Sequence, residues 1–206
     1  MATVAEKISP GIVSDGNGVS GNGHTAPLTR DELIEALYLE PGKAEIVDGR
    51  IVRFDMTGRK PSFAGDEIFF YLRQYVRATK PAGIAVGDGK AFLCSLPNRE
   101  SFSPDAAYYE GPDSGVKFFS GSPRFAVEVR SENDAEAEMK SKRDDYFAAG
   151  TEVVWDVDIL GGGEIVRKFT KMGGSQNPVA VFRRGETADA EPAVPGFTMP
   201  VDDLFE

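Results

Sequence analysis

Hydrophobic and polar residues alternate along this chain with two different periods, which predicts a mixture of helices and strands. Over residues 63–79, apolar side chains such as Ile68 and Leu72 recur at helical spacing. A short helix is predicted to begin near Thr29, and another to end at Gly150. Strands are predicted at residues 45–52 (a hairpin), 84–86, 91–94, 105–109, 124–129, 152–159, 164–170 and 179–182.

Capping and turn residues mark the boundaries of the first elements. Thr29 and Glu32 stand at the spacing of a capping box, just ahead of an apolar run. Asp48 and Gly49 suit a two-residue hairpin turn, because both residue types tolerate a positive φ. The first strand of this predicted hairpin carries Glu45.

The first 27 residues differ in composition from the rest of the chain. They are rich in Gly, Ser and Asn and lack a periodic apolar pattern, which predicts a disordered tail over residues 1–27. Residues 28–206 are predicted to form a single domain. The sole histidine, His24, falls in the tail, so catalysis in the folded part is expected to use carboxylates and lysine.

Cysteine content and hydropathy indicate the cellular compartment of the protein. Cys94 is the only cysteine, which excludes a disulfide framework and a zinc site built on several thiolates. A single cysteine fits a reducing cytoplasm. No apolar run approaches the roughly 20 residues that span a bilayer. We therefore expect a cytoplasmic protein with no membrane partner.

The formal net charge of −10 opposes nonspecific attraction to a polyanion, because phosphate binding depends on clustered cations. A nuclease tolerates an acidic body if basic residues gather near its cleft. An ordinary solvated surface explains the same residues equally well. The basic candidates are Arg124, Arg130, Lys140, Lys142, Arg143, Arg183 and Arg184.

Two carboxylates in apolar strands and one lysine in the next helix form the candidate chemistry. Asp105 follows Pro104 at the start of a strand, and Glu128 lies within the apolar strand at residues 125–129. Buried carboxylates need compensation, and a divalent cation bound by oxygen ligands provides it in a chemically useful form. In the following helix, Lys142 falls on the inward, apolar face. The three residues together suggest a metal-dependent nuclease.

Each of these residues also has a structural interpretation. A helical lysine is usually a solvated charge. Glu128 would form an ion pair with Arg130 or Arg143, and Asp105 would serve as a turn or strand-entry residue after Pro104. Each structural interpretation is credible alone, but the combination of the three residues is less easily explained in this way.

Several short segments carry a family resemblance through their order and spacing. In these segments, which run from about Leu28 to Glu206, the chain resembles the Uma-two family of putative restriction endonucleases, long catalogued as a domain of unknown function, within the PD-(D/E)XK nuclease superfamily. The segments are Glu45-Ile46-Val47-Asp48-Gly49, Ser103-Pro104-Asp105, Val127-Glu128-Val129-Arg130-Ser131, Lys142 through Tyr146 to Gly150, Val154-Trp155-Asp156-Val157-Asp158 and Pro195-Gly196-Phe197-Thr198.

The resemblance implies an α/β (mixed α+β) fold with a restriction-endonuclease-like core, in which helices flank a central mixed sheet. It also implies DNA as the substrate and Mg²⁺, or alternatively Mn²⁺, as the cofactor. Asp105, Glu128 and the carbonyl of Val129 would hold the metal. Lys142 would take the role of the superfamily lysine. Glu45 matches an acidic position that would hold a second metal or orient a metal-bound water.

The chain departs from the superfamily pattern at two places. Arg130 stands where the superfamily has lysine, and we expect it to clamp a phosphate instead. Relatives often carry histidine at the start of the helix near Phe63. The alternative function is therefore a noncatalytic binding or scaffold module, as a homodimer that uses Phe118, Phe119 and Trp155. For Trp155, core packing is the favoured interpretation.

Overall fold

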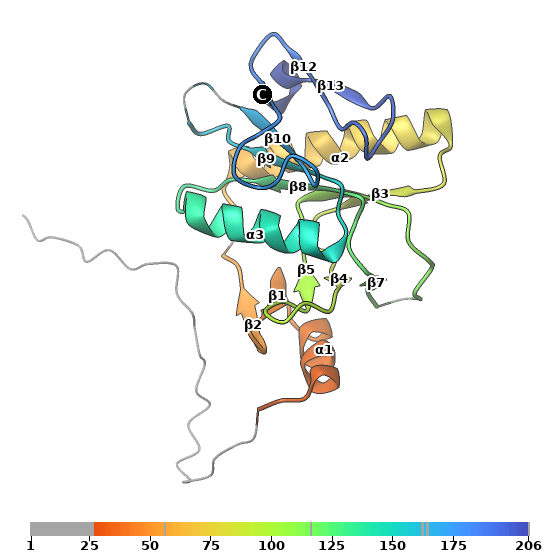
Figure 1. Cartoon of the computed structure of the whole chain (residues 1–206), viewed down its shortest axis with the longest axis vertical. Helices are drawn as coiled ribbons and strands as arrows, with labels where there is room; N and C mark the ends of the chain where they lie inside the picture. Colours follow the sequence, from red (N-terminus) through yellow and green to blue (C-terminus); the bar gives the residue numbers. More distant parts are fainter. Residues whose placement is uncertain (1–26, 56, 116, 162, 164, 206) are drawn as a thin grey trace, which may run out of the picture.

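A six-stranded sheet lies at the centre of the computed structural model, which describes residues 27–55, 57–115, 117–161, 163 and 165–205 (Figure 1). In order across the sheet, the strands are β11 (Ala180–Phe182), β10 (Val166–Thr170), β9 (Val153–Val157), β8 (Phe125–Val129), β6 (Ala106–Tyr109) and β3 (Ile84–Gly87). β8 and β9 run parallel, whereas the other neighbours run antiparallel. The predicted central mixed sheet is therefore confirmed.

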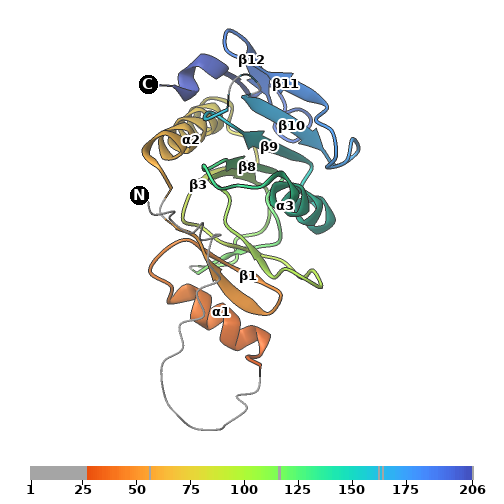
Figure 2. The same cartoon turned by 90° about the vertical axis from the view of Figure 1, so that its left-hand side faces the viewer.

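Two helices, α2 (Arg59–Thr79) and α3 (Glu136–Ala149), cover opposite faces of this sheet (Figure 2). Val127 packs with side chains of α2 in one buried cluster, and its neighbour Ala126 packs with side chains of α3 in another. The two cores are separate because successive side chains of a strand point to opposite faces. By the same alternation, Glu128 lies on the α3 face.

The N-terminal elements form a smaller layer next to the α3 face of the sheet (Figures 1 and 2). The amide of Asp48 donates to the carbonyl of Asn98, and the amide of Glu100 donates to the carbonyl of Ile46. These bonds join the hairpin to the chain that leads into β6. The elements of this layer are α1 (Arg30–Tyr38), the hairpin β1 (Ala44–Val47) and β2 (Arg50–Arg53), and a small sheet of β5 (Ser101–Phe102), β4 (Phe92–Leu93) and β7 (Phe119–Ser120).

The C-terminal segment completes the core on the α2 face. It contains the strands β12 (Thr187–Asp189) and β13 (Thr198–Pro200) and the 3₁₀ helix η1 (Val201–Leu204). Trp155 is fully buried there, with its ring 5.1 Å from that of Phe125 and 6.0 Å from that of Phe197. Core packing of Trp155 is thus confirmed, and this residue is not available to an interface.

Local sequence signals gave several element boundaries correctly. The Thr29 capping box forms, with the Glu32 amide 3.4 Å from the threonine hydroxyl. The hairpin turn has φ of 50° at Asp48 and 69° at Gly49. α2 begins at Arg59, a few residues earlier than predicted. Pro61 does not prevent this, because it lies in the first turn, where its missing N–H is not needed for a helical hydrogen bond.

Two other sequence predictions concern the tail and the membrane. The predicted tail and His24 lie outside the described residues, apart from the last residue of the tail. No helix within the described ranges is long and apolar enough to cross a bilayer.

Candidate active site

Glu128 and Lys142 meet between the sheet and α3. Lys142 Nζ lies 2.8 Å from Glu128 Oε2 and 3.2 Å from Glu45 Oε1. The hydroxyl of Tyr146, one turn further along α3, donates to Glu128 Oε1 at 2.6 Å. Lys142 therefore points inward as predicted. Its partner is the strand carboxylate, so Glu128 is not the counter-ion of Arg130 or Arg143.

Glu45 reaches the same place from the hairpin. Its side chain is 1% exposed and forms an ion pair with Arg99, which also pairs with Asp145 of α3 at 2.8 Å. The amide of Ser103 donates to Glu45 Oε1 at 2.9 Å. Glu45 is thus held by α3, through Lys142, and by residues 99–103, which lead directly to Asp105.

Asp105 stands just before β6, beside the strand that carries Glu128. Its Oδ2 accepts a hydrogen bond from the amide of Val129 at 2.7 Å, and its own amide donates to the carbonyl of Val127 at 3.0 Å. The other carboxylate oxygen pairs with the ammonium of Lys43, which also lies 3.1 Å from Asp88. Asp105 is therefore held between the end of β8 and a lysine of the N-terminal layer.

Lys43 is the site residue that sequence reasoning missed. It comes immediately before β1, two residues from Glu45, and the alternation of an extended strand would place both side chains on one face. That two-residue spacing is the sequence signal that could have assigned Lys43 to the site. The ion pair between Lys43 and Asp105 could not be predicted from local sequence patterns, because 62 residues separate the two partners.

The charges of the site influence one another strongly. Burial raises the pKa of Glu128; Lys142 opposes this rise, and the nearby charge of Asp105 adds to it. Burial also disfavours the charge of Glu45, but Lys142 and Arg99 outweigh it and lower the pKa of this group. The pKa of Lys43 is raised, since Asp105 and Glu128 together overcome its burial. Three carboxylates and two lysines thus form one electrostatic unit.

Arg130 lies one strand away from these carboxylates. Its Nε and Nη2 donate to the two oxygens of Asp156 on β9 at 2.6 and 2.7 Å, and it also pairs with Glu136. Arg143 of α3 pairs with the same two carboxylates. The structure therefore brings Glu45, Asp105, Glu128 and Lys142 together and places Arg130 beside them in a separate ion-pair group. The phosphate contact of Arg130 stays a prediction.

The chemistry of the oxygen donors suits a hard divalent cation. Asp105 and Glu128 are carboxylates on adjacent strands, and the charge of Asp105 already disfavours ionised Glu128. A cation between such groups would favour both ionised forms. Within the part of the chain that the structure describes, no group of three or more His, Cys, Asp and Glu side chains is placed to hold a metal ion. Lys43 and Lys142 supply the compensating charge.

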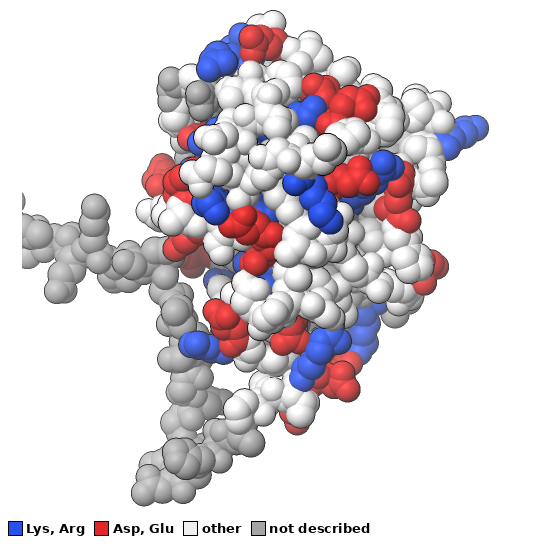
Figure 3. Space-filling model, viewed as in Figure 1, with Lys and Arg blue, Asp and Glu red and all other residues white. Residues whose placement is uncertain are grey.

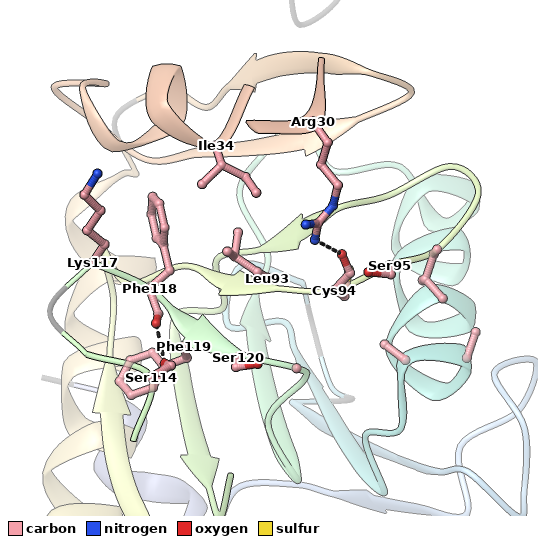
Figure 4. Close-up of a pocket in the computed structure, with 14 residues that line it drawn as sticks. Arg30, Ile34, Leu93, Cys94, Ser95, Ser114, Lys117, Phe118, Phe119 and Ser120 are labelled. Carbon is pink, nitrogen blue, oxygen red and sulfur yellow. Dashed lines mark hydrogen bonds between the residues drawn. The ribbon is translucent and has the colours of Figure 1, made fainter. Parts of the chain in front are cut away.

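A pocket of about 710 Å³ opens between α1, the small sheet and the end of α3 (Figure 4). Phe118, Leu93 and Ile34 point into it, and Arg30 donates to the carbonyl of Cys94 at its edge. Of the described residues that line this pocket, none is a predicted site residue. The carboxylates and lysines occupy a different part of the molecule.

Comparisons with known proteins bear on the family and the fold of this chain. A family model described as Uma2, a putative restriction endonuclease, matches residues 31–202. A solved structure from Anabaena variabilis ATCC 29413, described as a putative nuclease belonging to DUF820, is similar with a TM-score of 0.66 and 17% identity, over 87% of this chain and 98% of that chain. No curated protein matches the sequence. The structural likeness confirms the predicted restriction-endonuclease-like fold.

Proposed function

This chain belongs to the Uma2 family of putative restriction endonucleases, and from that premise we propose that it is a metal-dependent endonuclease that hydrolyses phosphodiester bonds in DNA. One observation supports the proposal more than any other. Lys142 contacts Glu128 and Glu45 at the point where Asp105 meets the end of β8. A lysine between carboxylates at the end of a strand is suited to phosphoryl chemistry.

Asp105, Glu128 and the carbonyl of Val129 would hold the metal, with Mg²⁺ or Mn²⁺ as the ions that suit oxygen ligands. When bound, such an ion would polarise the phosphate and would lower the pKa of the attacking water. Glu45 would serve the site from the hairpin, where its contact with the Ser103 amide orients the segment before Asp105.

Lys142 would stabilise the negative charge that grows on the phosphate oxygens during attack. Its ammonium is positioned by Glu128 and Glu45, so its charge is held in place before the substrate arrives. The raised pKa of Lys142, to which these carboxylates contribute against burial, keeps it protonated at neutral pH. It therefore acts as a fixed cation and not as a general base.

A second candidate function is a nuclease-fold module that binds without cleaving. Protein donors already contact both oxygens of Asp105 and both oxygens of Glu128. These contacts favour a structural role for the carboxylates. A homodimer would then use Phe118 and Phe119, which are partly buried at the edge of the small sheet.

We place either form of the protein in the cytoplasm, where the buried thiol of Cys94 would stay reduced.

Conversion of supercoiled plasmid to nicked or linear DNA tests the proposed function. Purified protein with Mg²⁺ or Mn²⁺ is expected to cleave, and Asp105→Ala and Lys142→Ala are each expected to reduce the rate by at least about 100-fold. Lys140→Ala is the matched control, because Lys140 lies on the same helix and pairs with Asp144 at the surface. It should cleave like the parent protein.

The other outcomes are equally informative. If the folded parent protein neither cleaves nor binds a divalent cation, the noncatalytic module is the better description. If Asp105→Ala and Lys142→Ala cleave as fast as the control, the catalytic residues lie elsewhere.

A further inference from the structure

Three arginines converge on Asp156, which is fully buried in β9. Arg130 follows β8, Arg143 lies on α3 and Arg167 lies on β10. Each donates a hydrogen bond to the carboxylate of Asp156. One carboxylate cannot neutralise three guanidinium groups, so the group needs further negative charge.

Glu136, the first residue of α3, supplies this charge from the surface. Its carboxylate contacts Arg130, lies 2.6 Å from Arg143 Nη2 and lies 3.7 Å from Arg167 Nη1. In contrast to Asp156, its side chain is 57% exposed. Burial disfavours its charge, but the bonds from Arg143 and Arg130 outweigh this and lower its pKa. Glu136 is thus a solvent-facing anion on top of three converging arginines.

The arginines have more donor capacity than the two carboxylates use. Arg167 Nε is buried and has no hydrogen-bond partner among the described residues. With Asp156 and Glu136 both ionised, three guanidinium groups leave a net charge of +1, and movement of Glu136 would raise it to +2. This local positive charge is opposite in sign to the net charge of −10 of the whole protein. On the surface shown in Figure 3, basic and acidic side chains are interspersed.

The arginine group is adjacent to the proposed catalytic carboxylates. Asp156 is the register partner of Glu128 across the parallel pair β8 and β9, so both side chains face α3. Lys142 and Arg143 are likewise neighbours on α3. Adjacent strands lie about 4.8 Å apart, and successive phosphates of one DNA strand are separated by more than their rise of about 3.4 Å along the helix axis. The arginines are therefore within reach of a phosphate next to the one that is cleaved.

We propose that Arg130, Arg143 and Arg167 form a subsite for a backbone phosphate of the substrate, and that Glu136 occupies this subsite until the phosphate displaces it. A carboxylate and a phosphate accept the same paired N–H bonds from a guanidinium group. Asp156 stays in place and orients the arginines. The N-terminus of α3, where Glu136 sits, also favours an anion. The inference rests on the proposed function for the identity of the ligand as DNA.

The test is DNA binding by Glu136→Gln, measured by fluorescence anisotropy with a labelled 20-base-pair duplex in the absence of divalent cations. The variant is expected to bind about tenfold more tightly than the parent protein, because no charged group competes with the phosphate. Glu138→Gln is the matched control. Glu138 is an exposed acid in the same first turn of α3, and it should change the affinity less than about twofold.

Arg167→Gln provides an independent variant, which decides the matter if Glu136→Gln fails to fold. Arg167 is the most exposed of the three arginines, at 18% of its side chain. Its loss is expected to weaken DNA binding and to reduce the slope of log affinity against log salt by about one unit. Equal affinities for Glu136→Gln and Glu138→Gln, or an unchanged affinity and slope for Arg167→Gln, would overturn the subsite.

Calorimetry with inorganic pyrophosphate separates this inference from the proposed function. If no form of the protein binds DNA, but Glu136→Gln binds pyrophosphate and Glu138→Gln does not, the anion subsite is real and DNA is the wrong ligand. If neither variant binds pyrophosphate or DNA, the subsite is wrong as well.

Discussion

At the scale of single residues, the two lysines of the site, Lys142 and Lys43, differ in their carboxylate partners. Lys142 contacts two carboxylates and is held on the inward face of a helix, where its helical spacing predicted it. Lys43 contacts Asp105 at a position where a divalent cation would compete with it. Because strand and helix periodicities are local, the sequence predicted that Glu128 lies in a strand and that Lys142 lies on the inward face of its helix. It could not place Lys43, because that pairing depends on tertiary contacts.

Replacement of Lys43 by Met should therefore expose a competition between the lysine and a divalent cation. Without metal, the variant is expected to lose on the order of 3 kcal/mol of unfolding free energy, since Asp105 keeps a poorly solvated charge without its cation. Added Mn²⁺ should raise the Tm of this variant more than that of the parent protein. Thermal unfolding with and without Mn²⁺ measures both effects.

Lys90→Met is the control for this comparison. Lys90 is an exposed lysine whose ammonium lies near the carbonyl of Asp88. Its replacement should leave the Tm and the metal response close to those of the parent protein. A metal-induced rise in Tm that is equal in Lys43→Met and the parent protein would show that Lys43 does not compete with the ion.

At the scale of elements, the site depends on the attachment of the hairpin to α3. Lys142 attaches α3 directly to Glu45, and Arg99 adds a second attachment through its pairs with Glu45 and Asp145. The sequence predicted the hairpin from Asp48 and Gly49, whose turn chemistry is local. It missed β12 and β13, because strands of three residues each are too short to show a periodicity. These strands pair with each other, and their buried Ala188 and Met199 belong to the core cluster on the α2 face.

Arg99→Met is expected to destabilise the protein by about 3 kcal/mol or more, because it leaves Glu45 and Asp145 buried without their shared cation. Urea unfolding measures this loss. Lys140→Met removes a surface pair with Asp144 and should cost less than about 1 kcal/mol. If both variants unfold at the same urea concentration, the buried pairs do not fasten the hairpin.

At the scale of the whole molecule, the described part of the chain combines a central sheet with an N-terminal layer that contributes to the same site. The resemblance gave the mixed sheet correctly, and the alternation along β8 gave the separation of its two faces. The net charge of −10 gave no sign of the arginine group. Arg130, Arg143 and Arg167 come from three elements, and only the fold brings them to Asp156.

The extent of the folded domain can be tested by truncation. Residues 1–26 lie outside the described part of the chain, and their removal is expected to leave the Tm within about 2 °C of that of the full chain. A protein that begins at Leu39 lacks α1 and its buried Leu33 and Leu37. It should lose more than about 6 °C. A large loss on removal of residues 1–26 alone would contradict the predicted tail.

Parallel neighbours in a sheet need a crossover connection, and α3 provides it between β8 and β9. Glu128, Lys142 and Asp156 therefore belong to one uninterrupted stretch of chain, whereas Lys43 meets Asp105 across 62 residues. Contacts between residues close in sequence form sooner, because less chain entropy is lost in closing the loop. On the ribosome, 62 residues are synthesised between Lys43 and Asp105, whereas 14 separate Glu128 from Lys142, so the second pair has both partners in the growing chain after far less synthesis.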